Sequence, residues 1–190
     1  MANFDWIQTY TGKKFFPLDP REEDVDIIDI AHALSNQCRY TGHTREFYSI
    51  AQHSVLVSHT CDSVDAFYGL LHDSAEAYIC DLARPVKHSE SMRLYRDAEK
   101  KLLKVILGKY GLNGDKIPVS VKIADNMVLM AERRDLMPPP SEPWSTERFD
   151  AIKEKIVPWR PNIAEVTFMN RFNALNIVKS YLNTDKVQAL

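Results

Sequence analysis

The chain has 190 residues, 45% of them hydrophobic, with a formal net charge of −2 and a pI of about 6.3. This length and apolar content predict a single domain, residues 1–190, with a core of its own, while the small net charge disfavours a nucleic-acid coat or scaffold. Ionisable residues interrupt every apolar stretch before the roughly 20 residues of a membrane span, and the start MANFDWIQTYTGKK lacks a secretory pattern, so we expect a soluble, cytoplasmic protein.

The predicted elements begin with a small arm. Aromatic and β-branched residues around Thr11-Gly12 predict a hairpin or an extended segment. Beyond it, apolar residues recur with a period of about 3.6 between short clusters of proline, which is typical of helices. The predicted helices are residues 26–36, 46–60, 63–79, 90–110, 118–136, 146–155 and 164–182. We therefore expect an all-α fold, a compact multi-helix bundle with a small N-terminal β or irregular arm.

Three cysteines are spread over the first half of the chain. Cys38, Cys61 and Cys80 form neither a CxxC pair nor an even set. This usage fits a reducing compartment, and we interpret all three as small core hydrophobes.

Ionisable residues occur in segments that the apolar pattern predicts to be buried. His53 lies in YSIAQHSVLVSHTC, where a single histidine is more often a core or boundary residue than a ligand. The pair His72-Asp73 follows FYGLL, and a buried carboxylate is costly unless it is paired, hydrogen-bonded or bound to a metal. The alternative is a neutral histidine hydrogen-bonded beside a capped aspartate.

A third segment, VKIADNMVLMAERRDLM, places Asp125 within an apolar helical stripe. If helix 118–136 crosses the two helices that carry His53 and His72-Asp73, two imidazoles and two carboxylates meet at one point. Such mixed nitrogen and oxygen donors suit one divalent ion with open positions for water and substrate. Mn, Co, Ni, Fe, Zn and Mg all remain candidates.

The spacing of these residues is similar to a known pattern. His53, His72-Asp73 and Asp125 resemble the H…HD…D signature of HD-domain metal-dependent phosphohydrolases, over roughly residues 26–136. The stretch LLHDSAEAYICDLARPVK (Leu70–Lys87) further resembles bacterial HD-domain 5′-deoxynucleotidases, in which HDxxE is followed by an aspartate five residues later and by Pro-Val-Lys. The resemblance implies a helical fold, a metal held by these four residues, and a dimer.

Two carboxylates are candidates for acid–base chemistry. Glu76 lies four residues after His72, so on a helix it projects from the same face. There it could deprotonate the attacking water or protonate the leaving oxygen, unless it is an ordinary surface glutamate. The resemblance implies that Asp81 contributes to water activation, and the sequence does not decide between the two.

Substrate contacts are expected on both sides of this stretch. By the resemblance, Arg39-Tyr40 occupies the place of an Arg-Trp pair that contacts substrate, with Tyr40 in place of the tryptophan. His43 could donate to a phosphate or simply bond to backbone. Arg84 and Lys87 could neutralise phosphate oxygens, or be solvated loop charges. The run ERRDLM (Glu132–Met137) is interpreted as a salt-linked helix face.

The residues themselves favour metal-assisted hydrolysis of a phosphate ester, and the resemblance implies that the substrate is a deoxyribonucleoside 5′-monophosphate, cleaved to deoxynucleoside and phosphate. The alternative within this class is release of triphosphate from a deoxynucleoside triphosphate, and the alternative of another class is a module that binds a nucleotide or metal without turnover. The partner is then a small nucleotide, with no nucleic acid and no membrane. Base preference depends on several loops, among them MPPPSEPW, whose prolines exclude a helix.

Overall fold

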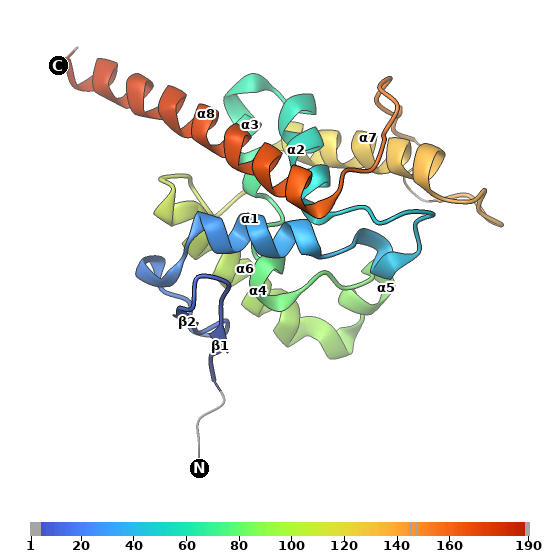
Figure 1. Ribbon diagram of the computed structural model, residues 1–190, viewed down its shortest axis with the longest axis horizontal. Coiled ribbons are helices and arrows are strands. Elements are labelled where there is room, and N and C mark those ends of the chain that lie inside the picture. The colour runs from blue at the N-terminus through green and yellow to red at the C-terminus, as the bar shows by residue number, and fades with distance from the viewer. Residues whose placement is uncertain (1–4, 145, 147, 189–190) are drawn as a thin grey trace.

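A computed structural model describes residues 5–144, 146 and 148–188, with side chains described as far as residue 179. It is mostly helical, with one small antiparallel sheet near the N-terminus formed by β1 (Ile7–Gln8) and β2 (Lys14–Phe15) (Figure 1). Gly12 adopts a positive φ of 83° in the turn between the strands, a conformation that costs glycine little. The predicted all-α bundle with a small β arm is confirmed.

The arm is tied to the body by buried contacts. The Thr11 backbone N–H and hydroxyl donate to the two Asp29 carboxylate oxygens at 2.7 and 3.0 Å. Phe15 is fully buried and stacks on Tyr78, with the ring centroids 3.8 Å apart. The hairpin therefore closes one end of the core.

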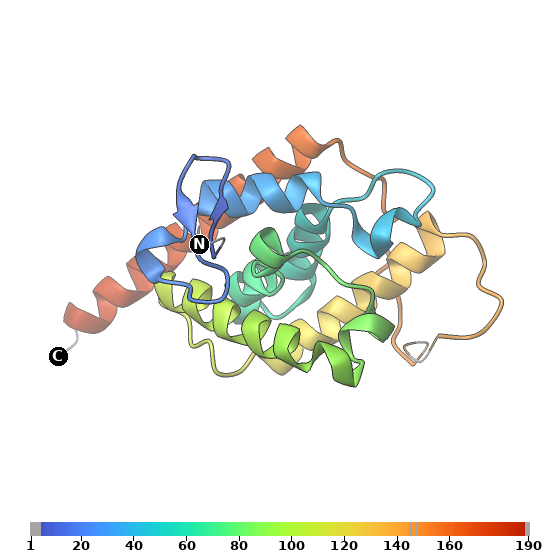
Figure 2. The same ribbon diagram turned by 90° about the horizontal axis from the view of Figure 1, so that it is seen from below.

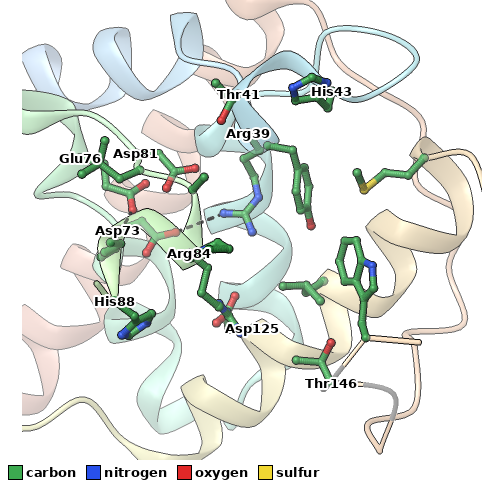
Figure 3. A pocket seen from close by; sticks show the side chains of 18 residues that line it. Arg39, Thr41, His43, Asp73, Glu76, Asp81, Arg84, His88, Asp125 and Thr146 are labelled. Atoms are coloured by element: carbon green, nitrogen blue, oxygen red, sulfur yellow. Dashed lines mark hydrogen bonds and ion pairs between the residues drawn. The ribbon is translucent and has the colours of Figure 1, made fainter. Parts of the chain in front are cut away.

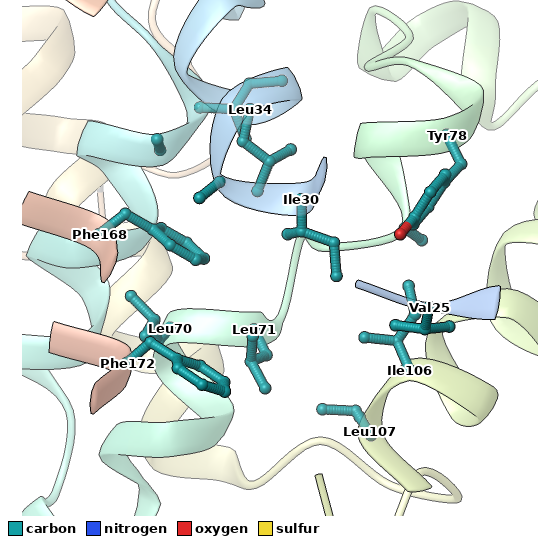
Figure 4. Close-up of a cluster of buried hydrophobic side chains, with 14 of the residues drawn as sticks. Val25, Ile30, Leu34, Leu70, Leu71, Tyr78, Ile106, Leu107, Phe168 and Phe172 are labelled. Atoms are coloured by element: carbon teal, nitrogen blue, oxygen red, sulfur yellow. The ribbon is translucent and has the colours of Figure 1, made fainter. Parts of the chain in front are cut away.

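The centre of the bundle is α2 (Ile50–Thr60), which packs against α1 (Ile27–Asn36), α3 (Ala66–Leu71), α7 (Val119–Leu136) and α8 (Pro161–Gln188). A Cβ at Gly69 would lie 2.9 Å from the Ser58 Cα, so glycine there allows α2 and α3 to approach closely. Figure 4 shows the adjoining apolar cluster, in which Ile30, Leu70 and Phe168 meet. Since His53 is on α2, it lies at the centre of the bundle.

The remaining helices flank this core. The long α6 (Arg93–Lys109) runs along one edge of the molecule (yellow-green in Figure 2) and contacts α5 (Arg84–Lys87). The C-terminal part of α8 extends beyond the other helices (Figure 1). Among the described residues, no helix combines the length and apolarity needed to cross a bilayer.

The predicted continuous helix over residues 63–79 is wrong. A 3-10 turn (Ser63–Asp65) leads into α3, which ends at Leu71, and α4 (Glu76–Ile79) follows after a turn. In that turn the Ser74 N–H donates to the Leu71 carbonyl and the Glu76 N–H to the Asp73 carbonyl, both at 3.0 Å, in the tighter pattern of a 3-10 turn. The His72-Asp73 pair therefore lies between two short helices.

The predicted helix over residues 146–155 is also wrong for the residues that the structure describes, which exclude Ser145 and Glu147. One turn forms within the segment, where the Phe149 N–H donates to the Thr146 carbonyl at 3.0 Å, and the backbone beyond it bonds to α7. The Ile156 N–H donates to the Asp135 carboxylate at 2.8 Å, and Arg134 donates to the carbonyls of Ile152 and Glu154, both at 2.9 Å.

The other helices differ from the predictions mainly at their ends. The predicted helix 46–60 begins only at Ile50, because Ser49 caps it and also pairs with Cys38 in an isolated bridge. A 3-10 turn (Glu90–Met92) replaces the start of helix 90–110. Predicted helix 164–182 begins earlier, with Pro161 in its first turn, a position where proline fits well.

All three cysteines are free thiols. Cys61 is buried, as predicted for a core hydrophobe, and Cys38 is partly buried. Cys80 is exposed, so its assignment to the core is wrong.

Candidate metal centre and adjoining cavity

Two helices and one turn bring the predicted ligands together. His53 comes from the middle of α2, His72 and Asp73 from the turn after α3, and Asp125 from α7. The His53 Nε2 atom lies 3.2 Å from Asp125 Oδ1 and 3.6 Å from Asp73 Oδ2, and His72 Nε2 lies 3.2 Å from Asp73 Oδ2. One ligand atom each of His53, His72 and Asp73 lies within 4.8 Å of the others, so this group can hold a metal ion.

The two imidazoles present lone pairs to this point. The Nδ1 atom of His72 donates to the Gly69 carbonyl at 2.8 Å, and that of His53 lies 2.7 Å from the Glu132 carboxylate. In the neutral imidazole the proton is then on Nδ1, which leaves Nε2 as an acceptor. Both Nε2 atoms are buried and have no hydrogen-bond partner among the described residues. Because an unpaired buried polar atom is costly, a cation between these atoms fits the site.

The charges around His53 favour the same conclusion. Burial and the nearby Arg39 charge lower the pKa of His53, but Glu132 and Asp125 outweigh them and raise it to about 9. For Asp73, burial acts in the opposite direction and raises the pKa. The charges of His72, His53 and Arg39 outweigh burial and bring the pKa of Asp73 below its ordinary value. The carboxylates thus stabilise positive charge at the imidazoles, whether it is a proton or a metal ion.

Glu132 organises the interior of the site. It is fully buried, and it accepts hydrogen bonds from the hydroxyls of Tyr40 and of Tyr48, the latter at 2.8 Å. Burial alone would raise its pKa, but Arg39 and His53 outweigh this effect and lower the pKa to about 2. Within the run ERRDLM, interpreted as a salt-linked helix face, Arg134 does pair with Asp135 at 2.7 Å, but Glu132 points into the interior. A signal did exist, because Glu132 lies seven residues after Asp125, two helical turns along the same face.

Arg39 connects this interior to Asp73. Its guanidinium lies 3.3 Å from the Glu132 carboxylate and 3.5 Å from that of Asp73. The following residues, Tyr40 and Thr41, both adopt left-handed conformations with φ of 55° and 53°. Such backbone is disfavoured for these residue types and persists only where contacts hold it. The Tyr40 hydroxyl is bonded to the buried Glu132, and the His43 N–H donates to the Tyr40 carbonyl at 3.0 Å.

A cavity of about 800 Å³ opens beside the candidate metal centre. Figure 3 shows Asp73, Glu76 and Asp81 on one side of it, with Arg39 between them and Thr146 on the opposite side. All the predicted catalytic and substrate-binding residues line the cavity, namely Glu76, Asp81, Arg39, Tyr40, His43, Arg84 and Lys87. Two of the predicted metal ligands, Asp73 and Asp125, also line it. The two imidazoles lie against these carboxylates.

Glu76 and Asp81 differ in their surroundings. Glu76 is buried, and its Oε2 atom has no hydrogen-bond partner among the described residues. Burial and the nearby Asp73 and Asp81 charges raise the pKa of Glu76 well above its ordinary value. Asp81 is partly exposed, and burial together with Asp73 raises its pKa despite the opposing effect of Arg39. Of the two, Glu76 is better placed to hold a proton.

One face of α6 supports the segment that carries these groups. Glu99 lies 2.5 Å from the Lys87 ammonium, which is itself 3.7 Å from the Glu76 carboxylate. The Tyr95 hydroxyl donates to the Cys80 carbonyl at 2.5 Å, next to Asp81. Neither α6 residue was predicted, because α6 reads in the sequence as an ordinary amphipathic helix.

Further residues that were not predicted also line the cavity. Among them are Trp144, Thr146 and the exposed His88.

The comparisons with known proteins identify relatives but no activity. No family model matches the chain. It is 30% identical over 128 residues to a protein of Rhodobacter capsulatus, covering 63% of this chain and 64% of that protein. It is 39% identical over 178 residues to YfdR of Escherichia coli (strain K12), covering 90% of this chain and 96% of YfdR. Both relatives are described as uncharacterized proteins. The chain belongs to the same protein family as YfdR.

Proposed function

We propose that this chain is a divalent-metal-dependent phosphohydrolase acting on nucleotides, as its resemblance to HD-domain enzymes implies. The observation that carries the proposal is the pair of buried, unpartnered Nε2 atoms of His53 and His72, which face two carboxylates at the edge of a cavity. A purely structural site would not need that cavity, nor the acidic residues Glu76 and Asp81 that line it.

The residues of the chain then have separate tasks. A bound divalent ion would lower the pKa of water and neutralise phosphate charge. Glu76, whose pKa is raised, holds a proton that it can give to the leaving oxygen. Asp81, at the same side of the cavity, is placed to accept a proton from the attacking water. Arg84 is placed to bind phosphate oxygens at the rim.

The positive charges of the cavity favour a substrate with one phosphate group. Lys87 is paired with Glu99 and Glu76, and Arg39 is paired with Glu132 and Asp73. Among the described lysine and arginine side chains that line the cavity, Arg84 is the one without an ion pair. A triphosphate needs more compensating charge than one arginine provides. We therefore propose a deoxyribonucleoside 5′-monophosphate as substrate and a deoxynucleoside triphosphate as the alternative.

The deciding experiment incubates purified protein with deoxynucleoside monophosphates and triphosphates, each with Mn, Co, Ni, Fe, Zn or Mg ions. Chromatography of the products distinguishes release of phosphate from release of triphosphate. We expect deoxynucleoside and phosphate from the monophosphate and no product after addition of a chelator. Triphosphate as the product would replace the first scheme by the second.

The variant Glu76→Gln separates catalysis from binding. We expect it to retain the metal, because Glu76 does not belong to the group of residues that can hold the ion, while hydrolysis falls by about 100-fold or more, as for loss of an acid–base group. Metal binding without turnover of any nucleotide by the unaltered protein would instead identify a module that only binds.

A further inference from the structure

The cavity has two chemically different ends. Around Asp73, Glu76 and Asp81 it is charged, with Arg39 and Lys87 paired to the carboxylates, and it borders the candidate metal centre. Its remaining wall includes the apolar or aromatic side chains of Leu129, Met137, Tyr40 and Trp144. A substrate that consisted only of phosphate and sugar would leave this apolar wall exposed to water, so the cavity favours a ligand with a flat apolar part.

We propose that Trp144 is the stacking surface for the base of the substrate, and that the Thr146 hydroxyl bonds to an edge of that base. This assignment rests on the proposed function, because it presumes that the phosphate of the same molecule lies at the metal centre. It identifies the substrate class as phosphate esters that carry an aromatic heterocycle. It also assigns a binding role to the loop between α7 and α8.

Two contacts define the position of the Trp144 ring. The Arg133 guanidinium lies over it, 5.6 Å from the ring centroid, and the Tyr40 ring is tilted by 45° at a centroid distance of 6.3 Å. The guanidinium supports one face of the indole, while Trp144 also lines the cavity and is only partly buried. An indole held in this way offers a large rigid surface at a low entropic cost.

Tyr40 is less suited to this role. Its hydroxyl is bonded to the buried Glu132, and the Arg39 guanidinium lies 5.3 Å from its ring centroid. The ring is therefore fixed by the interior of the site. It can form a side wall for a base, whereas Trp144 provides the surface.

Thr146 supplies an independent observation. It is 8% exposed, it lines the cavity, and its hydroxyl has no hydrogen-bond partner among the described residues. A buried hydroxyl without a partner destabilises the free protein, and a ligand that bonds to it removes this cost. The ring nitrogens and exocyclic groups of a base are suitable partners, since a hydroxyl can donate or accept.

The test compares deoxyadenosine 5′-monophosphate with 2-deoxyribose 5-phosphate, which has the same sugar and phosphate but no base. The quantity of interest is the ratio of their kcat/KM values with the activating ion. Stacking is worth about tenfold to hundredfold per base, so we expect Trp144→Leu to lower this ratio by such a factor. Trp144→Phe, which keeps a ring, should recover most of it. An unchanged ratio in Trp144→Leu would overturn the proposal.

Thr146→Val tests the hydrogen bond. We expect the ratio to fall by about threefold to tenfold, as for loss of a single hydrogen bond. The melting temperature should stay the same or rise, because a hydroxyl without a partner is replaced by a methyl group. A lower melting temperature with an unchanged ratio would show that the hydroxyl serves the fold and not the substrate.

Tryptophan fluorescence separates this proposal from the proposed function. We expect deoxyadenosine monophosphate to quench the wild-type emission and deoxyribose phosphate to quench it much less. The response should disappear in Trp144→Phe and persist in the control Trp6→Phe, whose tryptophan is 39% exposed and distant in sequence. Quenching without hydrolysis would support the base site while excluding the reaction. Hydrolysis with equal quenching by both ligands, or with none, would overturn the base site alone.

Discussion

The His53 Nδ1 atom lies 2.7 Å from Glu132 Oε1, and neither side chain has any exposed surface. Glu132 therefore fixes the orientation of the imidazole and directs Nε2 towards Asp125 and Asp73. Carboxylates in this position also make the imidazole a stronger metal ligand. The capacity of the site to hold a metal ion then depends on a residue that does not line the cavity.

This relationship predicts the behaviour of Glu132→Gln. We expect its affinity for the divalent ion to fall by about tenfold to hundredfold, the usual effect of losing such a partner. Isothermal titration calorimetry of metal-free protein measures it. Glu23→Gln, at an exposed glutamate, is the matched control. Equal affinities in the two variants would show that Glu132 acts only in folding.

Metal binding should also stabilise the folded protein. A ligand that binds only the folded state at 100 times its dissociation constant adds about 2.7 kcal/mol, which corresponds to a rise in melting temperature of roughly 5–10 °C for a chain of this size. Differential scanning calorimetry with the ion and with a chelator measures the shift.

Asp125→Asn should reduce this shift strongly, because it removes a charged oxygen 3.2 Å from His53 Nε2. The control Asp115→Asn alters a side chain that is 67% exposed and should retain the full shift. A full shift in Asp125→Asn as well would exclude Asp125 from the metal centre.

The residues that meet at the candidate metal centre could be predicted because ionisable groups are unusual in buried, apolar segments. His53, His72 and Asp73 stand in apolar segments, where each needs a reason to be present. Glu132 was missed because it begins the run ERRDLM, in which neighbouring charges suggest a solvated helix face. Glu132 follows the buried residues Val121 and Val128 at intervals of seven and four residues, which place it on the same face of α7. Only this spacing shows that its side chain points inward.

The errors in secondary structure have a different origin. Residues 146–155 contain helix-forming residue types, but Arg134 and Asp135 of α7 supply hydrogen-bond partners for this backbone. Such partners come from distant parts of the chain, so no local pattern reveals them. No local pattern reveals the position of Trp144 at the cavity either, because that position depends on the path of a loop.

The pKa of Glu132 predicts a loss of stability in acid. Its pKa is about 2 in the folded protein, against an ordinary value of about 4.5 in the unfolded chain, so the folded state binds this proton less readily than the unfolded state. The ionised Glu132 carboxylate contributes fully to the free energy of unfolding above pH 4.5, and this contribution is lost as the pH falls towards 2. By pH 3 it amounts to a loss of about 2 kcal/mol.

Urea unfolding of the wild type and of Glu132→Gln at pH 6 and pH 3 isolates this contribution. The difference in unfolding free energy between the two proteins should shrink by about 2 kcal/mol at the lower pH, because other carboxylates titrate in both. A difference that does not depend on pH would mean that the pKa of Glu132 is the same in the folded and the unfolded protein.

Cys80 offers a test of strain beside the site. Its φ of 61° and ψ of 162° lie in a region that is nearly restricted to glycine, and its side chain is exposed. The following residue is Asp81, and the Tyr95 hydroxyl bonds to the Cys80 carbonyl. The strained residue thus connects α4 to the candidate acid–base group.

Cys80→Gly should therefore stabilise the fold by about 0.5–2 kcal/mol, because release of the strain exceeds the added entropy of the unfolded chain. The matched control is Cys38→Gly, where φ is −84° and glycine gives no conformational advantage. That variant should lower stability by about 0.5–1 kcal/mol. Urea unfolding of both variants measures these changes in the free energy of unfolding. An equal decrease in the two variants would show that the backbone at Cys80 is not strained.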